Sequence, residues 1–170
     1  MVCIDAVDHG ERRPAGAGGG LPRQWHSSVS DEMVRDWSDT VDALSSIGPA
    51  VAYVGFSMGA MFGVPTVAAL PSVGAAVFVV GGMPTGDWID DAPLVPALAE
   101  AAGRLSHTDV LMLNTTGDET FSNSDVQALF EAIRARSKRL AWWSGAHDEW
   151  PDEMIGVSID FLRAAASIDG

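Results

Sequence analysis

Five short apolar runs constrain the fold of this 170-residue chain more than any other feature. They are almost continuously apolar rather than alternating with polar residues, which is typical of parallel strands covered on both faces. Amphipathic, helix-like segments separate them. The sequence therefore predicts an α/β protein, with a mostly parallel sheet, right-handed crossovers and flanking helices. We expect strands at 1–5, 50–56, 75–81, 109–114 and 139–144.

The segments between the runs carry helix signals. Ser30 is expected to cap a first long helix, and Ser124 to cap a later one, because serine oxygens accept from free N–H groups at helix starts. Pro151 suits the first position of a closing helix. Two further helices are expected at about 58–70 and about 93–102.

Composition limits the class of protein. Hydrophobic residues make up 47% and charged residues 19%, which fits one globular domain over 1–170. The net charge of −13 argues against nucleic acid and anionic membrane surfaces as partners. A small-molecule substrate is the expected partner.

The single cysteine, Cys3, excludes an internal disulfide and is expected to be buried in the first strand. Four scattered histidines form no metal-binding motif, so we expect no metal and no cofactor. No signal peptide and no apolar run long enough to span a bilayer is evident, so we expect a cytoplasmic protein.

The stretch "GFSMG", residues 55–59, fits the pattern G-x-S-x-G between a predicted strand and a predicted helix. Glycines at these positions allow a sharp turn that exposes the serine hydroxyl, so Ser57 is a candidate nucleophile. The alternative is a glycine-rich crossover without catalytic function.

A serine nucleophile needs a base, and the base needs an acid that orients it. Asp118 and His147 each follow a later predicted strand, and parallel strands bring such loops to one edge of the sheet. The alternatives are a turn aspartate and a solvated loop histidine. Asp125 is better explained as a first-turn helix charge, and His26 and His107 as ordinary loop histidines.

On these motifs the sequence resembles the α/β-hydrolase family, particularly its dienelactone-hydrolase-like and carboxylesterase members. The resemblance rests on "CIDAVDHGERR", "GFSMG", "GDE" after "LMLN" and "GAHDEWPD", which run over almost the whole chain. It implies Ser57 as nucleophile, Asp118 as acid and His147 as base. Dienelactone hydrolases carry cysteine at the nucleophile position, so the serine favours esterase chemistry.

One departure from the family concerns its usual first strands, which precede the "HGER" segment and have no counterpart here. The Met58 backbone N–H is expected to supply one oxyanion-hole donor, and N–H groups near His9 and Gly10 are candidates for a second. His9 and Arg12 are better explained as residues that anchor their loop. A sheet without its first strands has an exposed edge, so we expect a homodimer that covers it.

Segment 83–108 is expected to form a small cap in which Trp88 and Ile89 face the substrate. Trp150 is expected to line the same site, whereas Trp142 and Trp143 are better explained as core residues.

The predicted function is hydrolysis of a carboxylic ester or thioester with a short acyl group, through an acyl-enzyme. A non-catalytic binding or scaffolding protein, and an acyltransferase using the same triad, stay open as alternatives.

Overall fold

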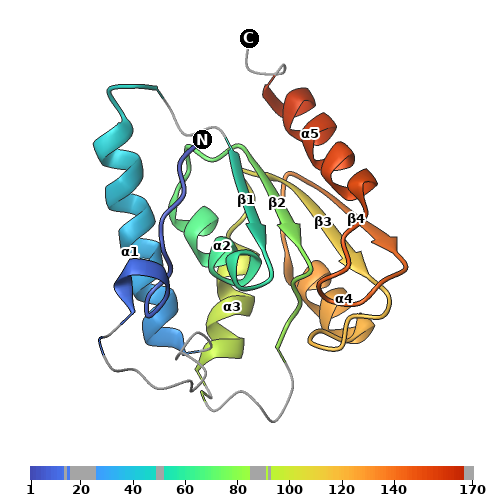
Figure 1. The fold of residues 1–170 in the computed structure, drawn as a ribbon. Coiled ribbons are helices and arrows are strands. Elements are labelled where there is room, and N and C mark those ends of the chain that lie inside the picture. Colours follow the sequence, from blue (N-terminus) through green and yellow to red (C-terminus); the bar gives the residue numbers. More distant parts are fainter. Residues whose placement is uncertain (14, 16–25, 49–51, 85–90, 92, 167–170) are drawn as a thin grey trace.

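A four-stranded parallel sheet with helices on both faces forms the centre of the protein (Figure 1). The computed structural model describes residues 1–13, 15, 26–48, 52–84, 91 and 93–166. The strand order is β1-β2-β3-β4, and all neighbours pair in parallel. This confirms the predicted α/β class. The strands are β1 (Ala52–Phe56), β2 (Ala75–Val79), β3 (Asp109–Thr115) and β4 (Ser137–Trp143).

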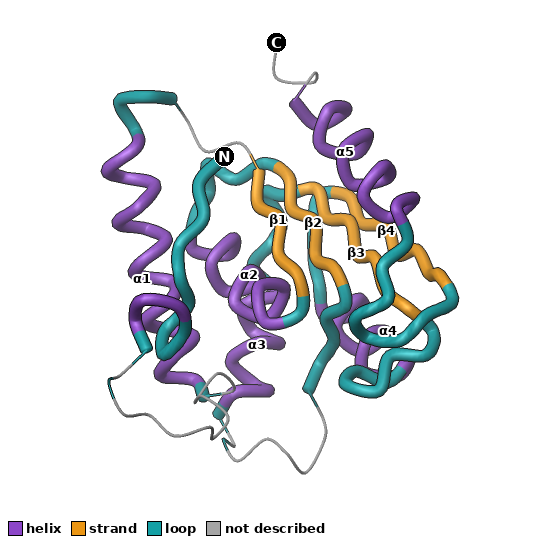
Figure 2. The backbone as a smooth tube through the Cα atoms, viewed as in Figure 1, coloured by secondary structure: helices purple, strands orange, loops and turns teal. Residues whose placement is uncertain are grey.

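The helices divide between the two faces of the sheet. Helices α2, α3 and α4 pack together on one face, with α1 against α2, and α5 packs on β2 and β3 from the other face (Figure 2). The helical elements are η1 (Gly10–Arg12), α1 (Ser27–Leu44), α2 (Met58–Ala69), α3 (Leu94–Gly103), α4 (Asn123–Ala132) and α5 (Asp152–Ala166).

Strands β2 and β3 are buried along their whole length, as their continuous apolar runs predict. Phe78 and Met112 face the α2–α4 layer, whereas Val77 and Leu111 face α5. Strand β1 lies at the sheet edge and alternates instead: it packs Tyr53 toward α2 and leaves its other face exposed.

The prediction of a strand at 1–5 is wrong. Residues 1–6 form no ladder with the sheet, and Ile4 and Val7 pack instead against Val29 and Phe62 of α1 and α2. The apolar run is therefore satisfied by contacts with helices rather than by strand pairing. Cys3 is exposed, so the prediction of a buried thiol is also wrong.

Helix α1 begins at Ser27, three residues before the predicted cap Ser30. The His26 imidazole accepts from the Ser28 N–H, and the buried Asp91 carboxylate accepts from the Ser27 N–H at 2.5 Å. The backbone hydrogen bond from Ser27 holds the pKa of Asp91 below its usual range. A contact from a distant part of the chain thus sets where α1 begins.

Helix α4 is capped by Ser122 rather than Ser124. The Ser122 hydroxyl accepts from the Asp125 N–H, and the Asp125 carboxylate accepts from the Ser122 N–H, which completes a capping box. The first-turn position predicted for Asp125 is confirmed. Helix α5 begins at Asp152, so Pro151 lies directly before the helix rather than at its first position.

Arg12 anchors the N-terminal segment to α1, as predicted. Its guanidinium lies 3.0 Å from Glu32, 2.5 Å from Asp36 and 3.1 Å from the Asp5 carbonyl oxygen. In the part of the chain that the structure describes, none of the helices has the length and hydrophobicity needed to cross a bilayer. The cytoplasmic location stays a prediction.

Candidate active site

Ser57 occupies the turn between β1 and α2 in a strained conformation. Its φ of 49° and ψ of −112° lie outside the regions that non-glycine residues favour, which typically costs about 1–3 kcal/mol. The Ser57 N–H donates to the Val79 carbonyl at 2.8 Å, and the Ser57 carbonyl accepts from Ala60 and Met61. These bonds to β2 and α2 hold the strained residue in place.

Gly55 is required at this turn because the first turn of α2 lies against it. A Cβ on Gly55 would collide with the Gly59 backbone, whereas a Cβ on Gly59 would meet nothing within 4 Å. Of the two glycines in the motif, only Gly55 is therefore required by packing.

The structure brings Ser57, His147 and Asp118 together. Ser57 Oγ lies 2.7 Å from His147 Nε2, and His147 Nδ1 lies 2.8 Å from Asp118 Oδ2. A carboxylate only accepts, so Nδ1 carries the proton of a neutral imidazole and Nε2 accepts from the serine hydroxyl. This is the arrangement needed for general-base activation of a serine.

The Asp118 side chain is fully buried, with 0% exposed, and that of His147 is 17% exposed. The second carboxylate oxygen of Asp118 accepts from the Thr120 and Phe121 N–H groups, at 2.8 and 2.9 Å. Asp118 therefore closes its own turn and also holds the imidazole. The turn role and the triad geometry, which the sequence offered as alternatives, are compatible.

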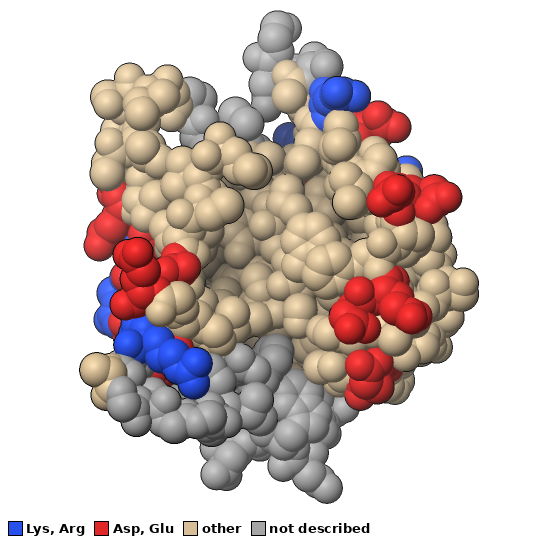
Figure 3. Space-filling view, in the orientation of Figure 1, with Lys and Arg blue, Asp and Glu red and all other residues tan. Residues whose placement is uncertain are grey.

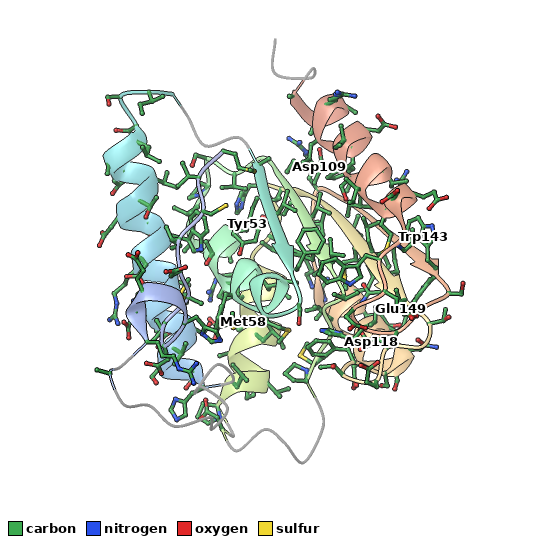
Figure 4. The ribbon with its side chains drawn as sticks, in the orientation of Figure 1. Tyr53, Met58, Asp109, Asp118, Trp143 and Glu149 are labelled. Atoms are coloured by element: carbon green, nitrogen blue, oxygen red, sulfur yellow. The ribbon has the colours of Figure 1, made fainter. Side chains whose placement is uncertain are left out.

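The three side chains meet because the strands are parallel. In Figure 4, Met58 at the start of α2 lies at the same end of the sheet as Asp118 and Glu149, which belong to the loops after β3 and β4. Asp109, the first residue of β3, lies toward the opposite end.

The Met58 N–H is the first of α2, where helical N–H groups have no intrahelical acceptor. Among the described residues no acceptor pairs with it. The positive end of the helix dipole also favours negative charge there. The His9 N–H, by contrast, donates to the Ala6 carbonyl at 3.0 Å, so it is not free to act as a second donor.

The predicted substrate-facing residues have different outcomes. Trp88 and Ile89 lie outside the described residues. Trp150 is 40% exposed, and its indole N–H is taken by the His147 carbonyl. The helix in the predicted cap segment, α3, buries Leu98 in the core and so belongs to the helical layer on the sheet rather than to a cap.

Trp142 and Trp143 pack against the core clusters on opposite faces of the sheet, as predicted. A hollow of about 250 Å³ between α1, α2 and α3 is lined by Phe62, Pro65 and Leu98 among others. Ser57 and His147 do not line it, so we assign it no part in the chemistry. In the described ranges no group of three or more metal-ligating side chains comes together.

Sequence reasoning missed two residues beside the triad. Phe56 stacks on Trp150, and Val80 adopts a positive φ of 46° directly after β2. Val80 donates its N–H to the Leu113 carbonyl at 2.8 Å. No sequence signal marks a strained valine, but the position of Phe56 next to Ser57 is visible in the motif.

Neither protein-family models nor curated proteins gave a match to the sequence. Solved structures did. A cold-adapted esterase from an Arctic intertidal metagenomic library shares 26% identity with a TM-score of 0.78, over 93% of this chain and 66% of that one. The fold is that of the α/β-hydrolases.

More distant structures agree on the fold. An esterase of Pyrococcus furiosus superposes with a TM-score of 0.65 at 13% identity, over 88% of this chain and 66% of that one. An Agrobacterium tumefaciens protein provisionally assigned to the α/β-hydrolases superposes with a TM-score of 0.57 at 19% identity. The superposition covers 79% of this chain and 60% of that one. The chain spans slightly less than two thirds of the length of the Arctic esterase.

Proposed function

We propose that the protein is a serine hydrolase of carboxylic esters or thioesters. The observation that carries the proposal is the pair of hydrogen bonds, 2.7 and 2.8 Å long, that joins a strained serine to a histidine and the histidine to a buried carboxylate. Similarity to α/β-hydrolase esterases supports the same class of reaction. The dienelactone-hydrolase-like branch stays a prediction.

In the proposed reaction Ser57 Oγ attacks the acyl carbonyl carbon while its proton passes to His147 Nε2. The carbonyl oxygen becomes an oxyanion that the Met58 N–H stabilises. The tetrahedral intermediate collapses as His147 protonates the leaving alcohol or thiol, which leaves an acyl group on Ser57. Water, deprotonated by His147, then attacks the acyl carbonyl carbon. The bond to Ser57 Oγ breaks as His147 returns the proton to that oxygen, and the acid is released. Asp118 stays ionised throughout and stabilises the imidazolium.

Among the described residues the Met58 N–H is the donor that we assign to the oxyanion, and losing one donor from such a site typically costs roughly 10²–10³-fold in kcat. We keep a short acyl group as the proposed substrate, with Trp88 and Ile89 facing it. A series of p-nitrophenyl esters of increasing acyl length tests the preference.

The test of the function is hydrolysis of p-nitrophenyl acetate by the wild type, Ser57→Ala and Ser144→Ala. Ser144 is an exposed serine near the histidine loop and serves as the matched control. We expect loss of activity in Ser57→Ala alone. Equal activity in all three proteins would contradict the proposal that Ser57 is the nucleophile.

Two further readouts separate the alternatives. No turnover of any acyl length, together with no fluorophosphonate labelling, would favour a binding protein. An ester product formed when an alcohol is added would indicate an acyltransferase.

We also propose that a second copy of the chain covers the exposed part of the sheet. Val54 and Phe56 pair in register with Val77 and Val79 on the face that α5 covers, yet they are 44% and 38% exposed. Among the described residues no strand pairs with the outer edge of β1, so its backbone groups are free for a copy.

Figure 3 shows the uncharged, hollowed centre of this side, with acidic side chains on its right flank and both acidic and basic side chains on its left. The whole chain carries a net charge of −13. Like charges on two copies repel, and salt screens them. Sedimentation velocity is therefore expected to show a dimer that strengthens as salt increases. A monomer at both low and high salt would count against it.

A further inference from the structure

His147 lies in a loop of irregular structure between β4 and α5, so no ladder or helix fixes its backbone. Side chains do so instead. The Glu119 carboxylate accepts from the His147 N–H at 3.2 Å, and the Trp150 indole N–H donates to the His147 carbonyl at 2.7 Å. Both polar groups of the histidine's backbone are therefore held by side chains from its two sides.

Glu119 directly follows the triad acid. The acid loop thus contacts His147 twice: Asp118 holds ring atom Nδ1, and Glu119 holds the backbone N–H. The hydrogen bonds from its own N–H and from that of His147 hold the pKa of Glu119 below its usual range. Glu119 therefore stays an ionised acceptor throughout the pH range in which a histidine base works.

Trp150 makes a second connection. Its ring stacks on Phe56, with centroids 4.8 Å apart and planes inclined by 35°. Phe56 is the last residue of β1 and is bonded directly to Ser57. One tryptophan therefore contacts the backbone of the base through its N–H and the neighbour of the nucleophile through its ring.

We propose that Glu119 and Trp150 are positioning residues that fix the His147 peptide, and that the Phe56–Trp150 stack sets its distance from Ser57. This deepens the proposed function and rests on it. The geometry of such a site must hold within about 0.5 Å, and a displacement of about 1 Å typically costs on the order of 10²-fold in rate. The assignment replaces the prediction that Trp150 mainly binds substrate.

The test compares kcat and KM for p-nitrophenyl acetate in matched variants. Glu119→Gln keeps an acceptor, whereas Glu119→Ala removes it. Trp150→Phe keeps a ring without the donor, and Trp150→Ala loses both. Asp148→Ala is the control, because this exposed acid adjoins His147 without a hydrogen bond to its backbone.

We expect Trp150→Ala and Glu119→Ala to lower kcat by about 10–100-fold with KM changed by less than about threefold. Glu119→Gln should recover most of the loss, Trp150→Phe should be intermediate, and Asp148→Ala should match the wild type. A raised KM at unchanged kcat in Trp150→Ala would overturn the proposal in favour of substrate binding. Equal losses in Asp148→Ala would also overturn it.

A second readout does not depend on activity. The imidazole Nδ1–H of His147, bonded to Asp118, should give a downfield proton NMR resonance in the wild type and in Glu119→Gln. We expect it to broaden or disappear in Glu119→Ala and Trp150→Ala. An unchanged resonance in both alanine variants would overturn the positioning role. Failure of the proposed function would appear separately, as turnover that survives Ser57→Ala.

Discussion

One oxygen of the Asp118 carboxylate lies 2.8 Å from His147 Nδ1. The other oxygen accepts hydrogen bonds from two backbone N–H groups of its own turn. Because its side chain is fully buried, the orientation of the imidazole depends on a group that is shielded from solvent. The same carboxylate therefore serves folding and the proposed chemistry, and the two can be separated by substitution.

Asp118→Asn should keep the fold and lose the activity. The amide oxygen can still accept from Thr120 and Phe121, but an amide N–H facing His147 favours the wrong tautomer. Comparable substitutions in serine triads lower kcat by up to about 10⁴-fold. The assay is p-nitrophenyl acetate turnover, with thermal unfolding recorded in parallel.

Asp125→Asn is the matched control for that substitution. It weakens the capping box of α4 and should cost about 1 kcal/mol of stability with activity unchanged. The reverse pattern, with activity lost in Asp125→Asn and kept in Asp118→Asn, would contradict the assigned roles.

The two glycines of the motif should respond differently to alanine. Gly55→Ala forces a Cβ into the Gly59 backbone and should lower the free energy of unfolding by at least about 2 kcal/mol, as expected for overpacking against backbone. Gly59→Ala has open space and should be neutral or stabilising by up to about 1 kcal/mol, because alanine favours helix. Urea denaturation measures both. Equal destabilisation would mean that the close approach of α2 to β1 is not as described.

Acid should weaken the fold through Asp109. Hydrogen bonds from the Arg136 guanidinium, at 2.9 and 2.5 Å, and from Ser137 hold the pKa of Asp109 below its usual value of 3.8. A lowered folded pKa stabilises the fold above the unfolded pKa and loses that contribution as pH falls through the folded value. Melting temperatures of the wild type and Asp109→Asn should therefore converge below about pH 3.8. A constant difference down to pH 2 would contradict this ion pair's role.

The four strands of the sheet, the strand-to-helix turn at Ser57 and the order of the three site residues could be predicted because each depends on a local pattern. Continuous apolar runs identify buried parallel strands, and parallel strands bring their following loops to one edge. Asp118 and His147 could be predicted as site residues from their positions after β3 and β4 alone.

Features that depend on distant contacts could not be predicted. The segment 1–5 has the apolar composition of a strand, but in the structure this part of the chain packs on α1 and α2 instead of pairing with the sheet. The start of α1 is set by Asp91, which is 64 positions from Ser27 in sequence. The contacts of Trp150 with Phe56 and with the His147 carbonyl likewise arise only after folding, because no local pattern brings β1 and the histidine loop together.

The proposed chemistry depends on activation of Ser57 by His147. Reaction with a fluorophosphonate, followed by intact-mass and peptide analysis, measures that activation in the wild type, Ser57→Ala and His147→Ala. We predict one adduct, on the peptide that contains Ser57, absent from Ser57→Ala and formed at least about 100-fold more slowly in folded His147→Ala. An adduct on another residue, or an equal rate without His147, would contradict the claim.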